Sequence, residues 1–472
     1  MKRILAAIIL LLTGYSLRAQ HQELNEKPGT WNTKEASITD STSILHAFRQ
    51  GNFNGSFRYF FMATDNATGL TDYYANAAGG GLRFETAKFH GFQFAISGYY
   101  IFNVGSSDLG ITDSITGLTN RYEIGLFDLE DPDNKKDIDR LEEFYLKYNY
   151  KKSSLLFGRQ LLNTPFINLQ DGRMRPTEVE GIYAEINEIN KLKIEGGWLY
   201  SISPRSTTKW YRTANSIGIY ATGVNPDGSK SQYKNNLTST GVFIFGTNYQ
   251  ATKNLKLQVW DVLIDNILNT AMLQADWQPP AKNNSAYMAS AQLIRQDAVE
   301  NGGNDDPNKT YAQKGSVAMT FGLRAGWKSK KLEAVINYNQ ITSKGRYLMP
   351  REWGRDPFFT FLPRERNEGL GDAQAIMIRA SYTFSKQLKT SLAAGYYELP
   401  DVKNYALNKY GFPSYTQING DVRFAFNGVL KGLEMQALVA GKINRGETYG
   451  NNRYTFNKVA MVNYNLVLNY LF

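Results

Sequence analysis

Apolar and polar residues alternate along short segments of this chain, and this alternation constrains the fold more than any other feature. The last eleven residues read VNYNLVLNYLF. Six apolar or aromatic residues fall on one parity: Val462, Tyr464, Leu466, Leu468, Tyr470 and Phe472. Asn463, Asn465 and Asn469 fall on the other. Successive side chains of a β-strand point to opposite faces, so the segment predicts a strand with one apolar and one polar face. Such a strand is typical of the end of a bacterial outer-membrane barrel.

The same pattern recurs from about residue 53 to the carboxyl terminus. Residues 91–104 give the best internal example, with Phe92 and Phe102 on one parity and Gln93 and Asn103 on the other. In all, 18 such segments start near residues 54, 72, 91, 140, 153, 178, 191, 240, 254, 270, 285, 315, 331, 372, 387, 416, 432 and 458.

Short and long connections alternate between these segments. Residues 151–153 and 328–331 form short connections, whereas residues 105–138 and 342–371 form long ones. Short turns at one rim and long loops at the other are expected of an antiparallel barrel in the outer membrane. We therefore predict an all-β fold, a transmembrane antiparallel β-barrel of about 18 strands with short periplasmic turns and long extracellular loops.

The beginning of the chain predicts export. It reads MKRILAAIILLLTGYSLRAQ, with two basic residues, an apolar run and small residues before a cleavage site after Ala19. No later apolar run approaches the roughly 20 residues of a helical membrane span. We predict a signal peptide (1–19), a short periplasmic segment (20–52) and the barrel (53–472), located in the cell outer membrane of a Gram-negative bacterium.

A secreted β-sandwich is the main alternative fold, and its outward face would be polar. Here one parity carries Phe, Tyr, Leu and Trp over most of the chain, while the other carries Asn, Gln, Ser and Arg. The mean hydropathy of −0.41 also suits a barrel, because lipid-facing and lumen-facing residues cancel along each strand. The membrane barrel is therefore favoured.

Strand parity predicts which charged residues face the lumen. A charged side chain facing lipid near the midplane costs about 2 to 4 kcal/mol. The inward set contains five arginines: Arg58, Arg83, Arg324, Arg379 and Arg423. Lys147, Lys193 and several carboxylates share this parity: Glu85, Glu143, Glu195, Glu333 and Asp421. Two interpretations stay open, one in which these charges pair and hold water, and one in which a basic track draws anions through the pore.

Two long loops are rich in functional groups. Residues 158–181 contain Arg159, Arg173 and Arg175, and residues 345–372 contain five arginines among Trp353 and three phenylalanines. Solvated loops have little reason to carry so many aromatic residues. We expect one or both loops to fold into the lumen.

These residues resemble the OprD-type specific porins, in the form seen in Bacteroidetes relatives. The resemblance rests on Gly158-Arg159-Gln160, Pro165, Asp171-Gly172-Arg173-Met174-Arg175-Pro176 and Gly181, and on Arg58-Tyr59-Phe60-Phe61-Met62, Leu70-Thr71-Asp72-Tyr73-Tyr74-Ala75-Asn76 and Ser203-Pro204-Arg205-Ser206. It implies a monomeric barrel of 18 strands whose third and seventh loops constrict the pore. It also implies a lumen arginine track for small carboxylate-bearing solutes, with Arg159, Arg173 and Arg175 near the constriction.

Function follows from this location. We predict a porin for passive diffusion of small hydrophilic solutes, with a preference for anionic or carboxylate-bearing molecules. The alternative is an adhesin or structural barrel that binds a partner through its long loops. An enzyme is disfavoured because the only histidines, His21, His46 and His90, precede the barrel or lie in a predicted periplasmic turn.

We predict no cofactor and no metal site. The chain contains no cysteine, which excludes disulfides and thiolate ligands. The acidic residues 128–139 fit no EF-hand spacing, and a solvated loop is favoured over a cation site. The expected partners are outer-membrane lipid, lipopolysaccharide and small solutes, with no nucleic acid.

Overall fold

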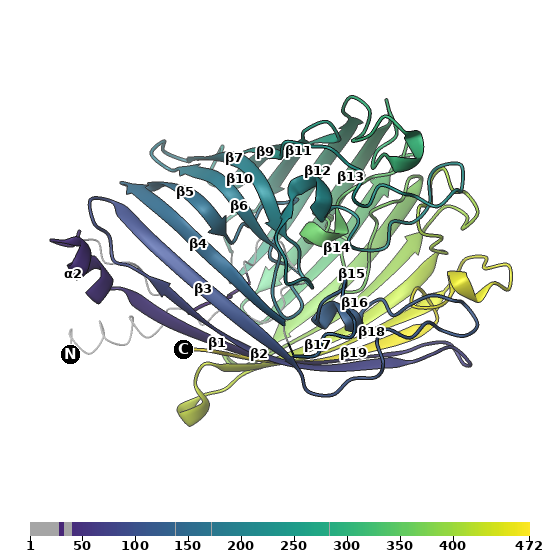
Figure 1. Cartoon of the computed structure of the whole chain (residues 1–472), viewed down its shortest axis with the longest axis horizontal. Helices are drawn as coiled ribbons and strands as arrows, with labels where there is room; N and C mark the ends of the chain where they lie inside the picture. Colours follow the sequence, from purple (N-terminus) through teal and green to yellow (C-terminus); the bar gives the residue numbers. More distant parts are fainter. Residues whose placement is uncertain (1–27, 33–39, 137, 171, 283) are drawn as a thin grey trace.

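The chain folds into a closed antiparallel β-barrel (Figure 1). The computed structural model describes residues 28–32, 40–136, 138–170, 172–282 and 284–472, so the predicted signal peptide lies outside the described residues. Eighteen strands close the barrel, and β19 pairs back onto β1. The short β8 pairs beside β7, which itself continues to β9.

The strands have the following bounds: β1 Asn52–Asp65, β2 Tyr73–Glu85, β3 Phe92–Asn103, β4 Ile138–Tyr150, β5 Ser153–Gln160, β6 Glu178–Ile186, β7 Leu192–Ser203, β8 Tyr211–Arg212, β9 Val242–Gln250, β10 Leu255–Ile264, β11 Leu268–Trp277, β12 Ser285–Ala298, β13 Val317–Ser329, β14 Leu332–Ile341, β15 Ala373–Thr383, β16 Leu388–Glu398, β17 Tyr415–Ala425, β18 Leu433–Asn444 and β19 Met461–Leu471. The predicted count of about 18 strands is confirmed.

Helices are few and short. Among the described residues, the one α-helix is α2, Ile44–Arg49, and six short 3₁₀ helices lie in connections: η1 Glu123–Leu126, η2 Thr213–Ser216, η3 Pro307–Lys309, η4 Arg351–Trp353, η5 Gly428–Leu430 and η6 Asn452–Tyr454. None of the helices in the part of the chain that the structure describes has the length and apolar composition of a transmembrane helix.

The two faces of the wall follow the predicted parity. On β19, Tyr464 and Tyr470 are exposed on the outer face, whereas Asn463, Asn465 and Asn469 are buried on the inner face. The inner asparagines bond to one another and to neighbouring strands, as when the Asn465 amide donates to Asn463 Oδ1 at 2.7 Å. Polar groups therefore line the lumen, where hydrogen-bond partners compensate their removal from water.

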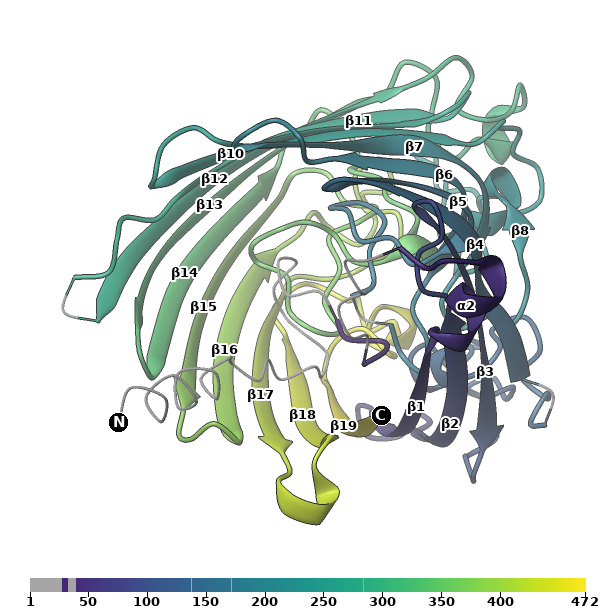
Figure 2. The ribbon, with the colours of Figure 1, turned by 90° about the vertical axis from the view of Figure 1, so that its left-hand side faces the viewer.

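Several long loops fold into the barrel from the rim opposite the short turns. Figure 2 looks into the barrel from the rim of short turns, and chain segments fill much of its interior. We call residues 161–177 loop 3, residues 204–241 loop 4, residues 342–372 loop 7 and residues 399–414 loop 8. Nearly all of loop 7 is buried, including Trp353, Phe358 and Phe361. The expectation that loops fold into the lumen is thus confirmed, and their apolar residues form a core inside the barrel.

Candidate functional site

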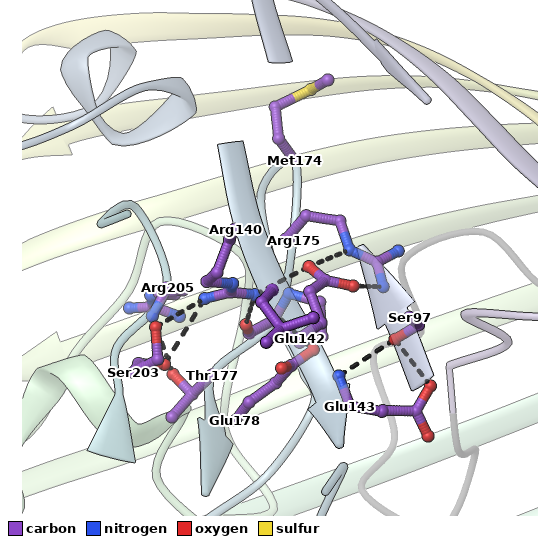
Figure 3. A network of polar contacts seen from close by, with 12 residues as sticks. Ser97, Arg140, Glu142, Glu143, Met174, Arg175, Thr177, Glu178, Ser203 and Arg205 are labelled. Atoms are coloured by element: carbon purple, nitrogen blue, oxygen red, sulfur yellow. Dashed lines mark hydrogen bonds and ion pairs between the residues drawn. The ribbon is translucent and has the colours of Figure 1, made fainter. Parts of the chain in front are cut away.

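A cluster of alternating charges lies on the inner wall formed by β2, β3, β4 and β6, together with loop 3 (Figure 3). We call it the wall cluster. Its guanidinium groups belong to Arg83, Arg140 and Arg175, and its carboxylates to Glu85, Glu142, Glu143 and Glu178.

Arg175 fastens loop 3 to this wall. Its Nε donates to Glu142 Oε1 at 2.6 Å, and its Nη2 donates to the second oxygen of the same carboxylate. Arg140 Nη2 donates to Glu142 Oε1 at 3.0 Å and to the carbonyl of Pro176 at 2.8 Å. Two parallel N–H···O bonds between a guanidinium and a carboxylate are both strong and directional. Burial alone would lower the pKa of Arg175, but the Glu142 carboxylate outweighs it and holds this pKa above its ordinary value.

A β-bulge makes the wall cluster possible. The register between β3 and β4 shifts between Ile96 and Gly98, so Ser97 faces two consecutive residues, Glu142 and Glu143. The Ser97 hydroxyl accepts from the backbone N–H of Glu143 at 3.0 Å and donates to its carboxylate at 3.2 Å. Both glutamates are buried on the inner face. A regular strand would have sent one of them toward lipid.

Two aromatic rings stack on the Arg175 guanidinium. Its Cζ lies 4.4 Å from the ring centroid of Tyr99 and 4.9 Å from that of Trp31, which belongs to the segment before the barrel. Glycine in β2 leaves room for both rings, because a Cβ on Gly81 would stand 2.4 Å from Tyr99 and 3.1 Å from Trp31. Cation–π contacts of this kind stabilise a desolvated guanidinium.

Carboxylates compensate every positive charge of the wall cluster. Arg83 Nε donates to Glu143 at 2.9 Å and its Nη1 to Glu85 at 3.2 Å, while Arg140 lies 3.7 Å from Glu178. Formally, four carboxylates face three guanidinium groups. This part of the wall therefore presents no excess of positive charge to a solute.

Arg58 differs from the wall cluster in its partners. Its Nε donates to Asn469 Oδ1 at 2.6 Å, and its Nη1 donates to the backbone carbonyls of Arg173 and Met174. These acceptors are neutral, and among the described residues no carboxylate forms an ion pair with Arg58. Arg58 is partly exposed and borders a small cavity of about 30 Å³ that is also lined by residues 28–30 and Arg175.

The predicted lumen arginines of the far wall also face inward. Arg324 on β13 donates to Asn337 Oδ1 at 3.0 Å and stacks on Phe359 of loop 7, with 4.5 Å to the ring centroid. Arg379 lies 3.5 Å from Glu333, and Arg423 donates to Asp421 at 2.9 Å. Pairing of inward charges, one of the two interpretations of the sequence, therefore occurs on both walls.

The three loop arginines differ in position, and the predicted position of Arg159 is wrong. Arg159 lies directly across from Phe144 and shares the parity of Phe157, and both of these phenylalanines are exposed on the outer face. It pairs with Glu180 at 3.4 Å and lies 4.5 Å from the ring centroid of Trp210. Arg159 therefore lies outside the lumen, contrary to expectation.

Arg173 and Arg175 do lie inside the barrel, in loop 3. Both side chains are buried, and the Arg173 carbonyl accepts from Arg58. Arg173 has a positive φ of 51°, which turns the loop sharply between Arg58 and the wall cluster.

Loop 7 crosses the lumen and contacts loop 3. The Asn168 amide donates to the carbonyl of Arg355 at 2.9 Å, and its Oδ1 accepts from the backbone N–H of Arg355 at 3.1 Å. Gly354 permits this close approach, because a Cβ there would stand 2.5 Å from Asn168 Oδ1. The two loops predicted to constrict the pore thus form one continuous structure.

Wall strands hold loop 7 through its backbone carbonyls. The donors come from strands on the far side of the barrel, at 2.6 to 3.2 Å: Gln292 to Pro357, Gln296 to Leu348, Gln417 to Pro363, Lys442 to Arg364 and Tyr397 to Thr360. Many separate hydrogen bonds therefore position this loop.

A buried lysine joins the long loops near their rim. Lys409 of loop 8 lies 3.7 Å from Glu368 of loop 7, and its Nζ lies 4.8 and 4.7 Å from the ring centroids of Tyr233 and Tyr311. Burial lowers the pKa of Lys409 to about 8, and the Glu368 carboxylate opposes this shift. This contact ties loop 8 to loops 4 and 7.

The acidic stretch near residue 130 contacts loop 4. Thr208 donates to Asp128 Oδ2 at 3.1 Å, and Glu130 pairs with Lys234 at 3.1 Å. Among the described residues, no group of three or more His, Cys, Asp or Glu side chains is arranged to hold a metal ion.

Sequence reasoning missed two buried arginines that organise the site. Arg140 joins the wall cluster, and Arg205 of loop 4 donates to the carbonyl of Arg351 at 3.0 Å while its backbone N–H donates to Thr177 Oγ1 at 3.0 Å. Arg140 shares the parity of Glu142, but the bulge places both out of phase with the rest of β4. Only the register of the neighbouring strand reveals that phase change.

Comparison with known proteins identifies the family. Residues 115–347 match the model of the outer membrane porins of the OprD family. No curated protein matches the chain. Three solved structures are similar to the chain. Acinetobacter baumannii OccAB3 has a TM-score of 0.70 and 16% identity, and the match covers 90% of this chain and 99% of OccAB3. Pseudomonas aeruginosa OccD3 has a TM-score of 0.69 and 12% identity, with 97% of this chain and 98% of OccD3 covered, and Pseudomonas aeruginosa OpdK with vanillate has a TM-score of 0.68 and 13% identity, with 90% of this chain and 99% of OpdK covered.

At these identities the structural likeness shows the fold, which agrees with the barrel described above. The family match adds the class of protein, since its members are outer-membrane porins. The chain therefore belongs to the OprD family of porins and lies in the outer membrane of a Gram-negative bacterium.

Proposed function

We propose that this porin is a monomeric channel that prefers small anionic or carboxylate-bearing solutes and has no catalytic role. The observation that carries the proposal is the setting of Arg58, which lies on the inner wall with neutral hydrogen-bond acceptors. A guanidinium that keeps its charge inside a low-dielectric channel attracts anions, and its planar fork suits carboxylates.

The contrast with the other inward charges supports this assignment. Arg83 and Arg175 each bond to a glutamate, so their attraction for a passing anion is largely cancelled. Arg58 lies beside them on β1 and borders the small cavity next to loop 3. One of the similar structures, OpdK, holds vanillate, an aromatic carboxylate, which agrees with the proposed class of solute.

Two observations weigh against the alternatives. The aromatic residues of loop 7 that suggested partner binding are buried inside the barrel, so they are not available to an external partner. His46 and His90 lie in α2 and in the turn after β2, at the rim of short turns, while His21 lies outside the described residues. Diffusion through the lumen therefore suits the site better than adhesion or hydrolysis.

The experiment compares Arg58→Gln with Arg295→Gln in planar bilayers under a salt gradient. Both variants remove one positive charge, but Arg295 is exposed on the outer parity of β12 and pairs with Asp297. We expect Arg58→Gln to reduce the anion-to-cation permeability ratio several-fold and Arg295→Gln to leave it unchanged. Liposome swelling with benzoate, an amino acid and a neutral sugar should show slower entry of benzoate alone in Arg58→Gln.

Three results would overturn the proposal. A wild-type channel that prefers cations would contradict anion preference directly. Equal permeability ratios for Arg58→Gln and the wild type would show that Arg58 does not set the selectivity. A purified protein that forms no conducting pores would instead contradict the channel itself.

A further inference from the structure

The short helix before the barrel has an apolar side that is largely exposed. Ile44, Leu45 and Phe48 of α2 are 62%, 60% and 47% exposed, whereas Ala47 is buried. At 3.6 residues per turn the three exposed apolar residues fall within an arc of about 100°, on a side of the helix adjacent to Ala47. The helix begins at a defined cap, because Ser43 accepts from the backbone N–H of His46 at 3.1 Å.

Helix α2 packs on the outer face of the wall. The ring centroids of Phe48 and Phe84 lie 6.0 Å apart, and those of Phe53 and Phe84 lie 4.7 Å apart. Phe84 follows the inward Arg83 on β2 and shares the parity of the exposed Leu82, so it points outward. The backbone N–H of Ala87 donates to the carbonyl of Ala47 at 3.0 Å, which fixes the helix to the turn after β2.

This position coincides with a ring of aromatic residues around the barrel. Large exposed aromatic side chains lie near the ends of other strands at the same rim: Phe92, Tyr148, Tyr249, Trp277, Tyr287, Phe384, Tyr470 and Phe472. In outer-membrane barrels such aromatic girdles mark the membrane–water interface. Phe84 belongs to the girdle at this rim, and therefore Phe48, which stacks on it, lies at the depth of the interface.

We propose that α2 is an interfacial helix that binds phospholipid of the periplasmic leaflet. Ile44, Leu45 and Phe48 insert at the boundary of headgroups and acyl chains and extend the lipid-facing surface of β1 and β2. Arg49 and His46 lie toward the headgroups, where a long basic side chain reaches phosphate while its stem covers apolar surface. The lipid, and not a protein partner, is the occupant because the exposed side is continuous with the girdle.

Site-directed spin labelling tests this proposal in the full-length protein reconstituted in phospholipid vesicles. The chain contains no cysteine, so each variant carries a single label. Labels at Leu45→Cys and Phe48→Cys report on the apolar side, and a label at His46→Cys reports on the opposite side of the same helix. Leu82→Cys, on the outer wall, is the lipid reference, and Lys330→Cys, in an exposed short turn at the same rim, is the water reference.

The readout is the ratio of collision rates with oxygen, which concentrates in lipid, and with a water-soluble nickel chelate. We expect the ratios at Leu45 and Phe48 to be several-fold higher than at Lys330 and to approach that at Leu82. The ratio at His46 should stay close to that at Lys330, which shows that the helix is folded and oriented. Retention of heat-modifiable mobility in each variant confirms an intact barrel.

Two outcomes would overturn the proposal. Ratios at Leu45 and Phe48 equal to that at Lys330 would place the apolar side in water. Labels at both positions that are immobile and shielded from oxygen and nickel alike would show that protein covers this side, either another segment of the chain or a periplasmic partner.

Discussion

Loop 3 and loop 7 both cross the lumen, but different kinds of contact hold them there. Loop 3 is anchored by a charged centre, the Arg175–Glu142 pair, which is buried and joined by Arg140, and its other contacts include hydrogen bonds such as that from Arg58 to the Arg173 carbonyl. Loop 7 depends on many separate bonds from wall side chains to its backbone carbonyls. Breaking a buried ion pair leaves an uncompensated charge, whereas losing one neutral hydrogen bond has a small effect. The position of loop 3 should therefore be sensitive to single substitutions, and that of loop 7 should be robust.

The largest expected effect comes from Glu142→Gln. This change leaves Arg140 and Arg175 without their shared carboxylate, and breaking such a buried pair costs about 3 to 5 kcal/mol. We expect loop 3 to detach, which raises single-channel conductance and current noise and lowers the free energy of unfolding in vesicles. Arg295→Gln breaks an exposed ion pair and should leave the stability close to that of the wild type, because water and salt screen such pairs. Equal behaviour of the two variants would contradict the role given to the wall cluster.

A smaller effect is expected for Trp31→Ala, which extends the comparison to the segment before the barrel. The Trp31 ring stacks on Arg175, and a desolvated cation–π contact contributes about 2 kcal/mol. Channel noise should rise, though less than in Glu142→Gln. Trp210→Ala removes a similar ring from Arg159 on the outer face and serves as the control, with an unchanged conductance expected. If Trp210→Ala changed the conductance as much as Trp31→Ala, the effect would not come from the lumen.

The smallest effect is expected for Gln417→Ala. It removes one bond to loop 7, from Gln417 Nε2 to the Pro363 carbonyl at 2.7 Å, and a hydrogen bond contributes about 1 kcal/mol. Conductance should stay close to that of the wild type. Adding Gln292→Ala and Gln296→Ala should increase conductance in steps, because the three anchors act at separate points of the loop. A single change that opened the pore as far as Glu142→Gln would show that loop 7 is not held by many independent contacts.

The inner wall shows which side-chain directions residue parity alone can predict. Arg58, Arg83, Arg324, Arg379 and Arg423 all face the lumen, because alternation in a paired strand leaves a side chain only two directions. The same reasoning failed where the strand is irregular. The bulge opposite Ser97 turns both Glu142 and Glu143 inward, and the residue types of β4 do not predict this bulge.

The prediction that Arg159 lies near the constriction was wrong for a related reason. The motif around it resembles the third-loop region of the family, but its register against Phe144 places it on the outer face. Its charge is accommodated there by Glu180 and Trp210. Register depends on the neighbouring strands, so a local motif cannot assign the face on its own.

The sequence by itself determined the barrel, its 18 strands and the side that meets lipid. These features follow from local alternation, since the membrane requires an apolar face on every strand and a closed ladder of backbone hydrogen bonds. Tertiary structure alone decided which charges pair with one another and how loops 3 and 7 contact each other. It also decided that the hydrogen-bond acceptors of Arg58 are neutral. Those contacts connect residues far apart in the chain, such as Arg58 with Asn469 and Asn168 with Arg355, and only strand closure and loop folding bring such residues together.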